Sequence, residues 1–151
     1  MEIRMAYPNE IQRIMEIIQD AKESLAQRQV DQWQDGYPSE EVILGDIRKG
    51  ESRIWEEEGK ILGTAMLSFR GESDYDRIYD GEWKLGEVSY ATIHRIAVLS
   101  TDRRRGTAGK LLKAMEEEIR KNGFSVIRMD THRDNVPMRT WLGSHGFLHC
   151  G

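Results

Sequence analysis

The sequence predicts one domain of the α/β (α+β) class, in which helices flank a mixed central sheet. Apolar residues recur at helical spacing over 11–25, three β-type segments follow one another over 53–98, and strands and helices then alternate to the end. The resulting order is β-α-α-β-β-β-α-β-α-β, which predicts antiparallel strands first and parallel pairing afterwards. A chain of 151 residues has the size of one domain, so we expect the domain to cover 1–151.

The helices are predicted from apolar periodicity and from capping residues. The first, over 11–25, carries one apolar stripe, and the second, over 40–49, starts after Ser39, a favourable N-cap. Two more helices are expected over 106–121 and 134–145. Each apolar stripe is expected to pack on the sheet.

The strands are predicted from β-branched and aromatic residues bounded by turn formers. They are expected at 3–5, 53–55, 60–69, 88–98, 124–130 and from 146 onward. The polar, glycine-containing segment 71–87 is expected to form a long hairpin loop between two of them.

Charge and composition narrow the class of protein. The formal net charge is −4, which argues against a nucleic-acid binder, because affinity for a phosphate backbone comes from many cations. No apolar run is long enough for a membrane span, and the single cysteine, Cys150, fits a reducing compartment. We therefore expect a cytoplasmic protein that binds neither nucleic acid nor membrane. His132, His145 and Asp130 are too scattered for a zinc pattern, so no metal is expected.

The segment 102–112, DRRRGTAGKLL, places arginines and two glycines before a helix. It fails the nucleotide-hydrolysing loop pattern, since Leu111 follows Gly109-Lys110, and it fails the dinucleotide pattern. Gly106 and Gly109 would let a ligand approach the backbone, and the amides of a helix N-terminus favour anions. The segment is therefore either a pyrophosphate cradle or a solvated basic turn.

The wider context favours the cradle. The segment 93–119, IHRIAVLSTDRRRGTAGKLLKAMEEEI, resembles motif A of the GNAT superfamily of acyl-CoA-dependent acetyltransferases. The pattern there is Arg/Gln-x-x-Gly-x-Gly/Ala, which Arg103, Gly106 and Ala108 meet.

A second segment resembles the companion motif B of the same family. In 130–147, DTHRDNVPMRTWLGSHGF, Asn135, Met138 and the pair Gly146-Phe147 fall at the usual intervals. The order of elements also matches that fold, and the resemblance covers nearly the whole chain. It implies a domain that uses acetyl-CoA as its co-substrate.

The resemblance also assigns residues to coenzyme A. The strand backbone would pair with the pantetheine arm, the loop amides would bind the pyrophosphate, and motif B would contact the arm. The residues concerned are Ile96, Ala97, Val98, Arg103, Arg104, Arg105, Gly106, Thr107, Ala108, Gly109, Lys110, Asn135 and Met138.

The catalytic groups are less completely matched. By resemblance, the Val98 N–H is the oxyanion donor. The position at which many members carry a glutamate base holds Thr92, so we favour His94, two residues further on, acting through a water. His94 could instead position the substrate or be a core histidine, and Glu87 is a further candidate base.

The acid that protonates the leaving thiolate is a departure from the family. Members often carry tyrosine where this chain has Leu142. A thiol pKa of about 8.5 lets the thiolate leave unassisted near neutral pH. Tyr7, Tyr37 and Tyr90 are possible substitutes that the sequence does not rank.

The acceptor side is expected in VDQWQDGYPS, which resembles a loop of some small bacterial members. Trp33 and Tyr37 could line an acceptor pocket and Asp31 could attract an amine. Alternatively, the segment is a rigid loop packed on its aromatic residues. The acceptor itself cannot be read from it.

The resemblance also raises the question of the final strand. Domains of this family normally complete the sheet with a seventh strand, whereas this sequence stops at Cys150-Gly151. Either the sequence is a shortened one or a partner chain supplies the strand, which makes a homodimer plausible.

The predicted function is transfer of an acetyl group from acetyl-CoA to a primary amine of a small molecule or peptide, by direct attack in a ternary complex. The alternative is a catalytically weak acyl-CoA-binding or regulatory module. It is favoured by Thr92 and Leu142, which stand where members of the family often carry the base and the acid. A nucleic-acid-associated protein that uses 103–105 is a third class, disfavoured by the net charge.

Overall fold

The computed structural model describes residues 2–71, 89–101, 106–131 and 135–150. The elements in chain order are β1 (Glu2–Met5), the 3₁₀ helix η1 (Pro8–Glu10), α1 (Ile11–Gln27), α2 (Glu40–Arg48), β2 (Ser52–Glu57), β3 (Lys60–Ser68), β4 (Ala91–Val98), α3 (Thr107–Lys121), β5 (Ile127–Arg128) and α4 (Val136–Ser144). The predicted loop at 71–87 lies almost entirely outside the described residues.

The sheet is mixed, as the sequence predicts. Its five strands lie in the order β1-β2-β3-β4-β5; the first four are antiparallel, and β5 pairs parallel to β4. β5 is only two residues long, shorter than the strand expected over 124–130. Its pairing with β4 stops at Thr92 and Arg128, so β4 continues without a described partner on that side.

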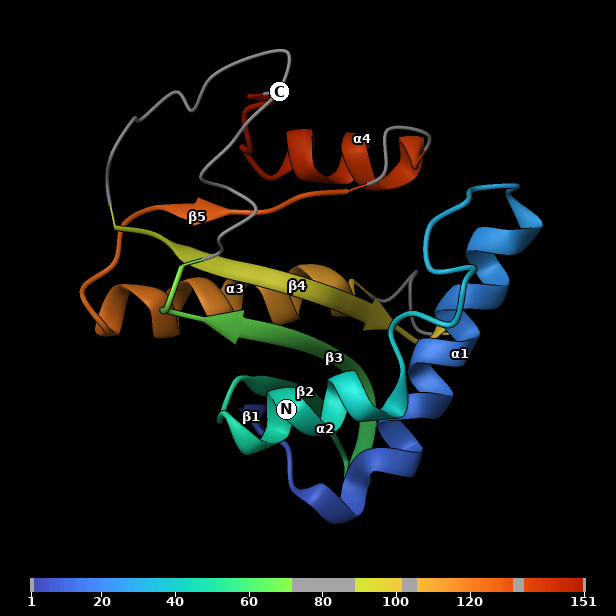
Figure 1. Ribbon diagram of the computed structural model, residues 1–151. Helices are drawn as coiled ribbons and strands as arrows, with labels where there is room; N and C mark the ends of the chain where they lie inside the picture. The colour runs from blue at the N-terminus through green and yellow to red at the C-terminus, as the bar shows by residue number, and fades with distance from the viewer. Residues whose placement is uncertain (1, 72–88, 102–105, 132–134, 151) are drawn as a thin grey trace.

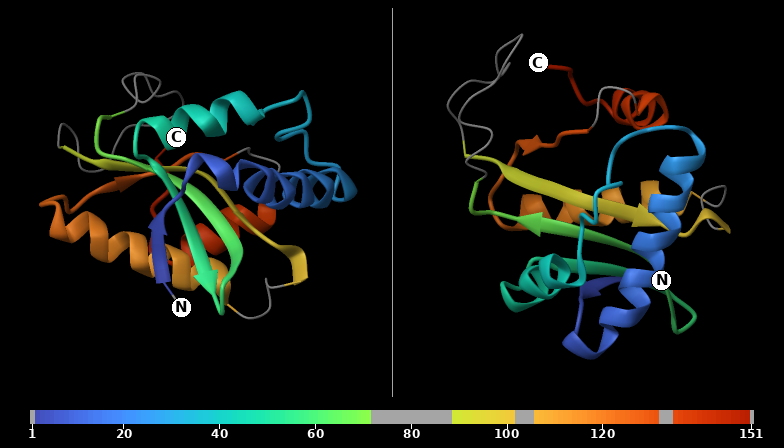
Figure 2. Two further views of the ribbon diagram at one scale, coloured as in Figure 1. Left: turned by 90° about the horizontal axis from the view of Figure 1, so that it is seen from below. Right: turned by 45° about the vertical axis from the view of Figure 1, so that its right-hand side comes forward.

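Helices cover both faces of the sheet. α1 and α2 lie on one face, where Ile14, Ile18 and Ile47 pack against Ile54 in one core cluster. α3 lies on the opposite face with a second cluster, and α4 lies beside β5 (Figures 1 and 2). The apolar stripes predicted from the sequence therefore form the helix surfaces that pack against the sheet.

The helix ends explain why the expected last strand is absent. After α4, Gly146 adopts φ +87°, the Phe147 N–H donates to the Leu142 carbonyl at 3.0 Å, and the Gly146 N–H donates to Gly143. This is a Schellman motif, which ends a helix by a left-handed residue. Residues 147–150, all described, form no strand. The prediction of a strand from 146 is wrong, because Gly146 and Phe147 terminate the helix.

A bulge in β4 shapes the sheet next to the first core cluster. The β3–β4 register shifts by one residue, so that Ala65 of β3 lies opposite both Arg95 and Ile96. Arg95 has φ +52°, a left-handed conformation that non-glycine residues rarely adopt. Gly63 of β3 lets the Val98 side chain of β4 pack closely against it, since a Cβ at position 63 would lie 3.3 Å from Val98 Cγ2. The bulge turns the Arg95 side chain towards α2.

Candidate functional site

A pocket of about 330 Å³ lies between β4, the C-terminal half of α1 with the loop that follows it, residues 129–131, and α4. It opens where β4 has lost its pairing with β5. Nine residues predicted from the sequence line it: His94, Ile96, Ala97, Val98, Ala108, Asn135, Met138, Trp33 and Tyr37. The pocket thus joins residues expected for the cofactor with residues expected for the acceptor.

Other predicted residues are not in the lining. Asp31 has an exposed side chain outside it, and Arg103, Arg104 and Arg105 lie outside the described residues, as does Glu87. Gly106, Thr107, Gly109 and Lys110 form the cap and first turn of α3, of which only Ala108 reaches the lining.

The N-terminus of α3 is suited to an anion. Gly106 caps it with φ +73°, and a Cβ added there would meet no atom within 4 Å. Helix geometry leaves the N–H groups of Thr107, Ala108 and Gly109 without intrahelical acceptors. The Lys110 N–H, also expected as a donor, is different, because it donates to the Gly106 carbonyl at 3.0 Å inside the helix.

Two side chains of the same turn complete the description of this end of α3. The Lys110 ammonium lies 3.4 Å from Glu57 Oε1, on the β2–β3 hairpin. The Thr107 hydroxyl is buried and has no hydrogen-bond partner among the described residues. The backbone amides, together with the partial positive charge of the helix end, are therefore the groups with which this turn can bind an anion.

The backbone of Val98 is directed away from β3. The Leu99 N–H donates to the Leu62 carbonyl at 3.1 Å. Donors alternate along an antiparallel strand, so the N–H of the preceding residue, Val98, points to the opposite side, where the pocket lies. An N–H in this position can donate a hydrogen bond to a ligand in the pocket.

His94 enters the pocket from β4 with its side chain 13% exposed. Its Nδ1 lies 3.7 Å from Asp130 Oδ1, which is too long for a hydrogen bond but within the range of an electrostatic contact. The sequence analysis did not pair these two residues. The sheet register explains their proximity, because Thr92 pairs with Arg128 in parallel and positions 94 and 130 follow two residues later; the sequence alone does not give this register.

Arg95 is a residue of the pocket that was not predicted from the sequence. Its Nε and Nη2 donate to the two carboxylate oxygens of Asp46 at 2.8 and 2.6 Å, and its Nη1 donates to the Tyr37 hydroxyl at 2.6 Å. Burial acts to lower the pKa of Arg95, but the hydrogen bonds and charge of Asp46, followed by Tyr37, outweigh it and raise that pKa above its ordinary value. The signal in the sequence was a charged residue within the buried strand ATIHRIAV.

Asn135 connects the two sides of the pocket. Its Oδ1 accepts from the Met138 N–H at 3.2 Å, which caps α4, and its Nδ2 donates to Gln32 Oε1 at 3.0 Å. Gln32 lies in the loop after α1, and the sequence analysis did not single it out. The side chain of Asn135 is thus held between a helix end and the acceptor-side loop.

The structure ranks the three tyrosines that could act on a leaving group. Tyr37 lines the pocket, whereas Tyr7 and Tyr90 do not. Tyr7 is 60% exposed and lies beneath the Arg4 guanidinium, and Tyr90 packs against Arg128. Trp141 lines the pocket beside Leu142, the position at which a family tyrosine was expected.

Among the described residues, no group of three or more His, Cys, Asp or Glu side chains lies close enough to hold a metal ion. None of the helices in the described part of the chain combines the length and hydrophobicity that crossing a membrane requires.

Comparisons with known proteins identify the family and the fold. The family model of the acetyltransferase (GNAT) family matches residues 11–147. The crystal structure of a GNAT-family acetyltransferase from Streptococcus agalactiae is 37% identical, with a TM-score of 0.89 and coverage of 99% of this chain and 86% of that one. A GNAT-family acetyltransferase from Listeria monocytogenes is 22% identical, with a TM-score of 0.78 and coverage of 99% and 87%.

A further solved structure, an acetyltransferase from Clostridium acetobutylicum with acetyl-CoA, shares the fold at 16% identity, with a TM-score of 0.61 and coverage of 98% of this chain and 90% of that one. No curated protein matches this chain. Because the family model spans most of the sequence, and because a GNAT structure matches it at 37% identity over nearly its full length, the chain belongs to the acetyltransferase (GNAT) family.

Proposed function

We propose that this protein transfers an acetyl group from acetyl-CoA to a primary amine of a small molecule or peptide, by direct attack in a ternary complex. The observation that carries the proposal is a pocket in which His94, the part of the β4 backbone beyond its described pairing with β5, and the first turn of α3 meet. Family membership supports the acetyl transfer. The amine and the roles of individual residues are our inference.

The pocket fits the cofactor at two places. The β4 backbone at Ile96–Val98 lines the pocket beyond the last β4–β5 pair, so it can bind an extended amide-containing arm as a further strand would. The amides of Thr107, Ala108 and Gly109 can hold a pyrophosphate at the helix N-terminus. Asn135 and Met138 would contact the arm from α4. The bound cofactor would supply an acetyl thioester.

His94 is proposed to take the proton from the acceptor amine, through a water. A histidine has a reference pKa of about 6.5, which suits a base near neutral pH. Asp130, 3.7 Å from Nδ1, would orient the ring. The Val98 N–H would stabilise the oxyanion that forms when the amine attacks the carbonyl carbon.

The leaving thiolate needs little help. A thiol with a pKa of about 8.5 is only about 1.5 units above neutral pH, which corresponds to about 2 kcal/mol. Among the three candidate tyrosines, only Tyr37 lies in the pocket lining, and the thiolate can leave without a proton from it.

The test is a thiol-release assay with acetyl-CoA across polyamines, aminoglycosides, amino acids and peptides, with mass spectrometry of each product. We expect one class to give amine-dependent thiol release together with an acetylated product. If acetyl-CoA raises the melting temperature but no amine accelerates thiol release, the protein is instead an acyl-CoA-binding module.

We also propose a cytoplasmic location and a homodimer. β5 has two residues and forms one edge of the described sheet, a position that a partner strand can cover. Sedimentation that shows only monomer at micromolar concentration would contradict the dimer.

A further inference from the structure

Three side chains from different elements form one connected group beside the pocket, which we call the Arg95 centre: Asp46 of α2, Arg95 of β4 and Tyr37 of the loop between α1 and α2. The side chains of Asp46 and Arg95 are only 7% and 12% exposed, whereas Tyr37 is 42% exposed. The group therefore runs from the interior to the pocket wall and ends on a hydroxyl.

Stability alone is a weak explanation for this group. A buried ion pair often contributes little net stability, because desolvation of both charges offsets their attraction. The backbone of Arg95 is also left-handed within a strand, at φ +52°. Strained residues of this kind occur preferentially at functional sites. Both features point to a role in the pocket that Tyr37 and Arg95 line.

The hydrogen bonds fix what the Tyr37 hydroxyl can offer. A tyrosine hydroxyl has one proton to donate and two lone pairs. One lone pair accepts from Arg95 Nη1 at 2.6 Å, so the O–H proton cannot point at Arg95 and is left for another partner. A hydrogen bond from a cation also polarises the O–H group and makes it a better donor. Tyr37 itself lines the pocket.

We propose that Tyr37 recognises the acceptor by donating its hydroxyl proton to an oxygen that the acceptor carries near its amine, and that Arg95 and Asp46 are positioning residues that hold this hydroxyl. The preferred acceptor class is therefore an α-amino carbonyl compound, either an amino acid derivative or a peptide terminus, rather than a simple alkylamine. This inference rests on the proposed acetyltransferase function and concerns the acceptor half of that site.

Two matched pairs of amines test the acceptor class. Phenylalaninamide and phenethylamine differ by the carboxamide, as do leucinamide and 3-methylbutylamine. With rates expressed per unprotonated amine, because the carboxamide lowers the basicity of the neighbouring amine, we expect the amide of each pair to have a kcat/KM about threefold to tenfold higher, the range of one hydrogen bond. Free phenylalanine and phenylalanyl-glycyl-glycine, run beside them, distinguish an amino acid from a peptide terminus.

The variant Tyr37→Phe tests the donor while leaving the Asp46–Arg95 pair in place. We expect the KM for phenylalaninamide to rise about threefold to tenfold. The KM for phenethylamine and that for acetyl-CoA should be unchanged, which a general structural defect would not produce. Tyr7→Phe is the matched control, because it removes a phenol hydroxyl outside the pocket lining.

Arg95→Lys tests the positioning role, since lysine cannot form the same fork. It should raise the KM for phenylalaninamide as Tyr37→Phe does, and the double variant should be no worse than the worse single variant, because both act through one hydroxyl. Additive effects would show that Arg95 acts separately from Tyr37 and would overturn its assignment.

The outcomes separate this inference from the proposed function. If both amines of each pair react equally, or if Tyr37→Phe affects both equally, the acceptor class is wrong although the enzyme is an acetyltransferase. A preparation that acetylates other amines but not phenylalaninamide would overturn it as well. If no amine releases thiol, the proposed function fails.

Discussion

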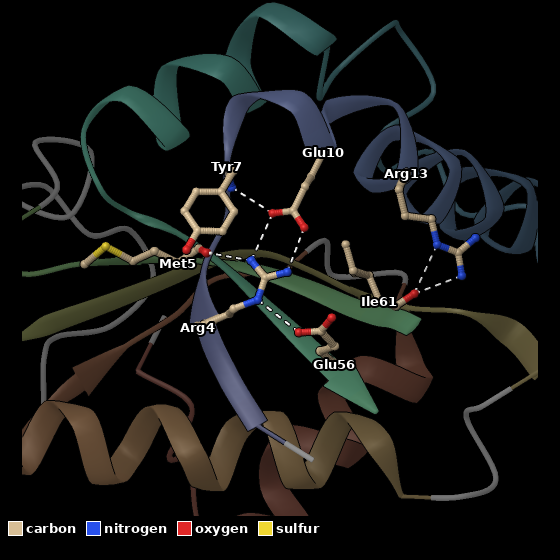
Figure 3. Close-up of polar contacts among 7 residues, drawn as sticks. All are labelled: Arg4, Met5, Tyr7, Glu10, Arg13, Glu56 and Ile61. Carbon is tan, nitrogen blue, oxygen red and sulfur yellow. Dashed lines mark hydrogen bonds and ion pairs between the residues drawn. The ribbon is translucent and has the colours of Figure 1, made fainter. Parts of the chain in front are cut away.

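Two arginines of this molecule are held by similar groups in different surroundings. Arg4 of β1 donates to both carboxylate oxygens of Glu10, at 3.0 and 2.7 Å, and to Glu56 at 3.0 Å (Figure 3). Arg95 of β4 also donates to both carboxylate oxygens of one acid, Asp46, but through Nε and Nη2, and it adds the Tyr37 hydroxyl. The side chain of Arg4 is 24% exposed and that of Arg95 is 12% exposed.

The difference lies in what each group reaches. The Arg4 group ties β1 to η1 and to β2, and none of its members lines the pocket. The Arg95 group joins α2 to the β4 bulge and ends at the pocket wall. Similar ion pairs can thus anchor a strand in one place and position a pocket side chain in another. The burial of each pair determines how much stability is lost when it is broken.

The largest effect is expected when one carboxylate is removed from each group and the losses in the free energy of unfolding are compared. Asp46→Asn keeps the size of the side chain but leaves the buried Arg95 charge without its counterion. We expect the free energy of unfolding to fall by about 3 kcal/mol, measured by urea denaturation at pH 7. A loss no larger than that of Glu10→Gln would show that burial does not distinguish the two groups.

We also expect catalysis to depend on the residues that line the pocket. His94→Ala should lower kcat at saturating acetyl-CoA by about tenfold or more, toward the roughly hundredfold to ten-thousandfold that a positioned base typically contributes. His149→Ala, which removes an exposed histidine outside the pocket lining, is the matched control and should leave kcat unchanged. A pH–rate profile of the His94 variant identical to that of the wild type would remove His94 from the mechanism.

The anion site at α3 can be tested for charge separately from strain. Gly106→Glu and Gly106→Gln add the same bulk at φ +73°, and only the first adds a negative charge. We expect the KM for acetyl-CoA to be about tenfold higher for the glutamate variant than for the glutamine variant, since like charges repel near a bound pyrophosphate. Equal values would show that these amides do not face the phosphates.

The sequence predicted local structure well wherever one physical signal dominated. The apolar period of α1 and the Ser39 cap of α2 were confirmed, the latter by a hydrogen bond of 3.3 Å from the Val42 N–H to Ser39 Oγ. A strand was wrongly predicted from Gly146, because a glycine followed by apolar residues fits a helix end as well as the start of a strand. Only the Schellman hydrogen bonds distinguish the two.

For the candidate site, the pattern of a strand, a glycine-containing loop and a helix allowed either a cradle or a basic turn before α3. The lining residues of β4 were proposed only from the resemblance to the family, and the structure places them in the pocket. The partner of Arg95 did not follow, because Asp46 lies 49 residues away and meets it only through the bulge. Side-chain pairs brought together by a register shift leave only an indirect mark on the sequence, here a charged residue within an apolar strand.

The smallest effect is expected in the Arg4 group, and it depends on pH. The hydrogen bonds of Arg4 lower the pKa of Glu10 below its ordinary value, so its ionised form is favoured in the folded state. The stabilisation is fully present above the unfolded-state pKa of about 4.3 and is lost as the pH falls through the lower folded-state value. Glu10→Gln should therefore cost about 1 kcal/mol at pH 7, since the group is partly solvated.

Urea denaturation of wild type and Glu10→Gln at pH 7, 5, 4 and 3 measures this dependence. The difference between the two proteins should shrink as the pH falls below 5, because wild type loses a stabilisation that the glutamine variant never had. Glu16→Gln is the control: Glu16 pairs with Arg13 on the surface, its side chain is 63% exposed, and its removal should change little at any pH. A difference that stays constant with pH would mean that Glu10 acts through the shape of its hydrogen bonds and not through its charge.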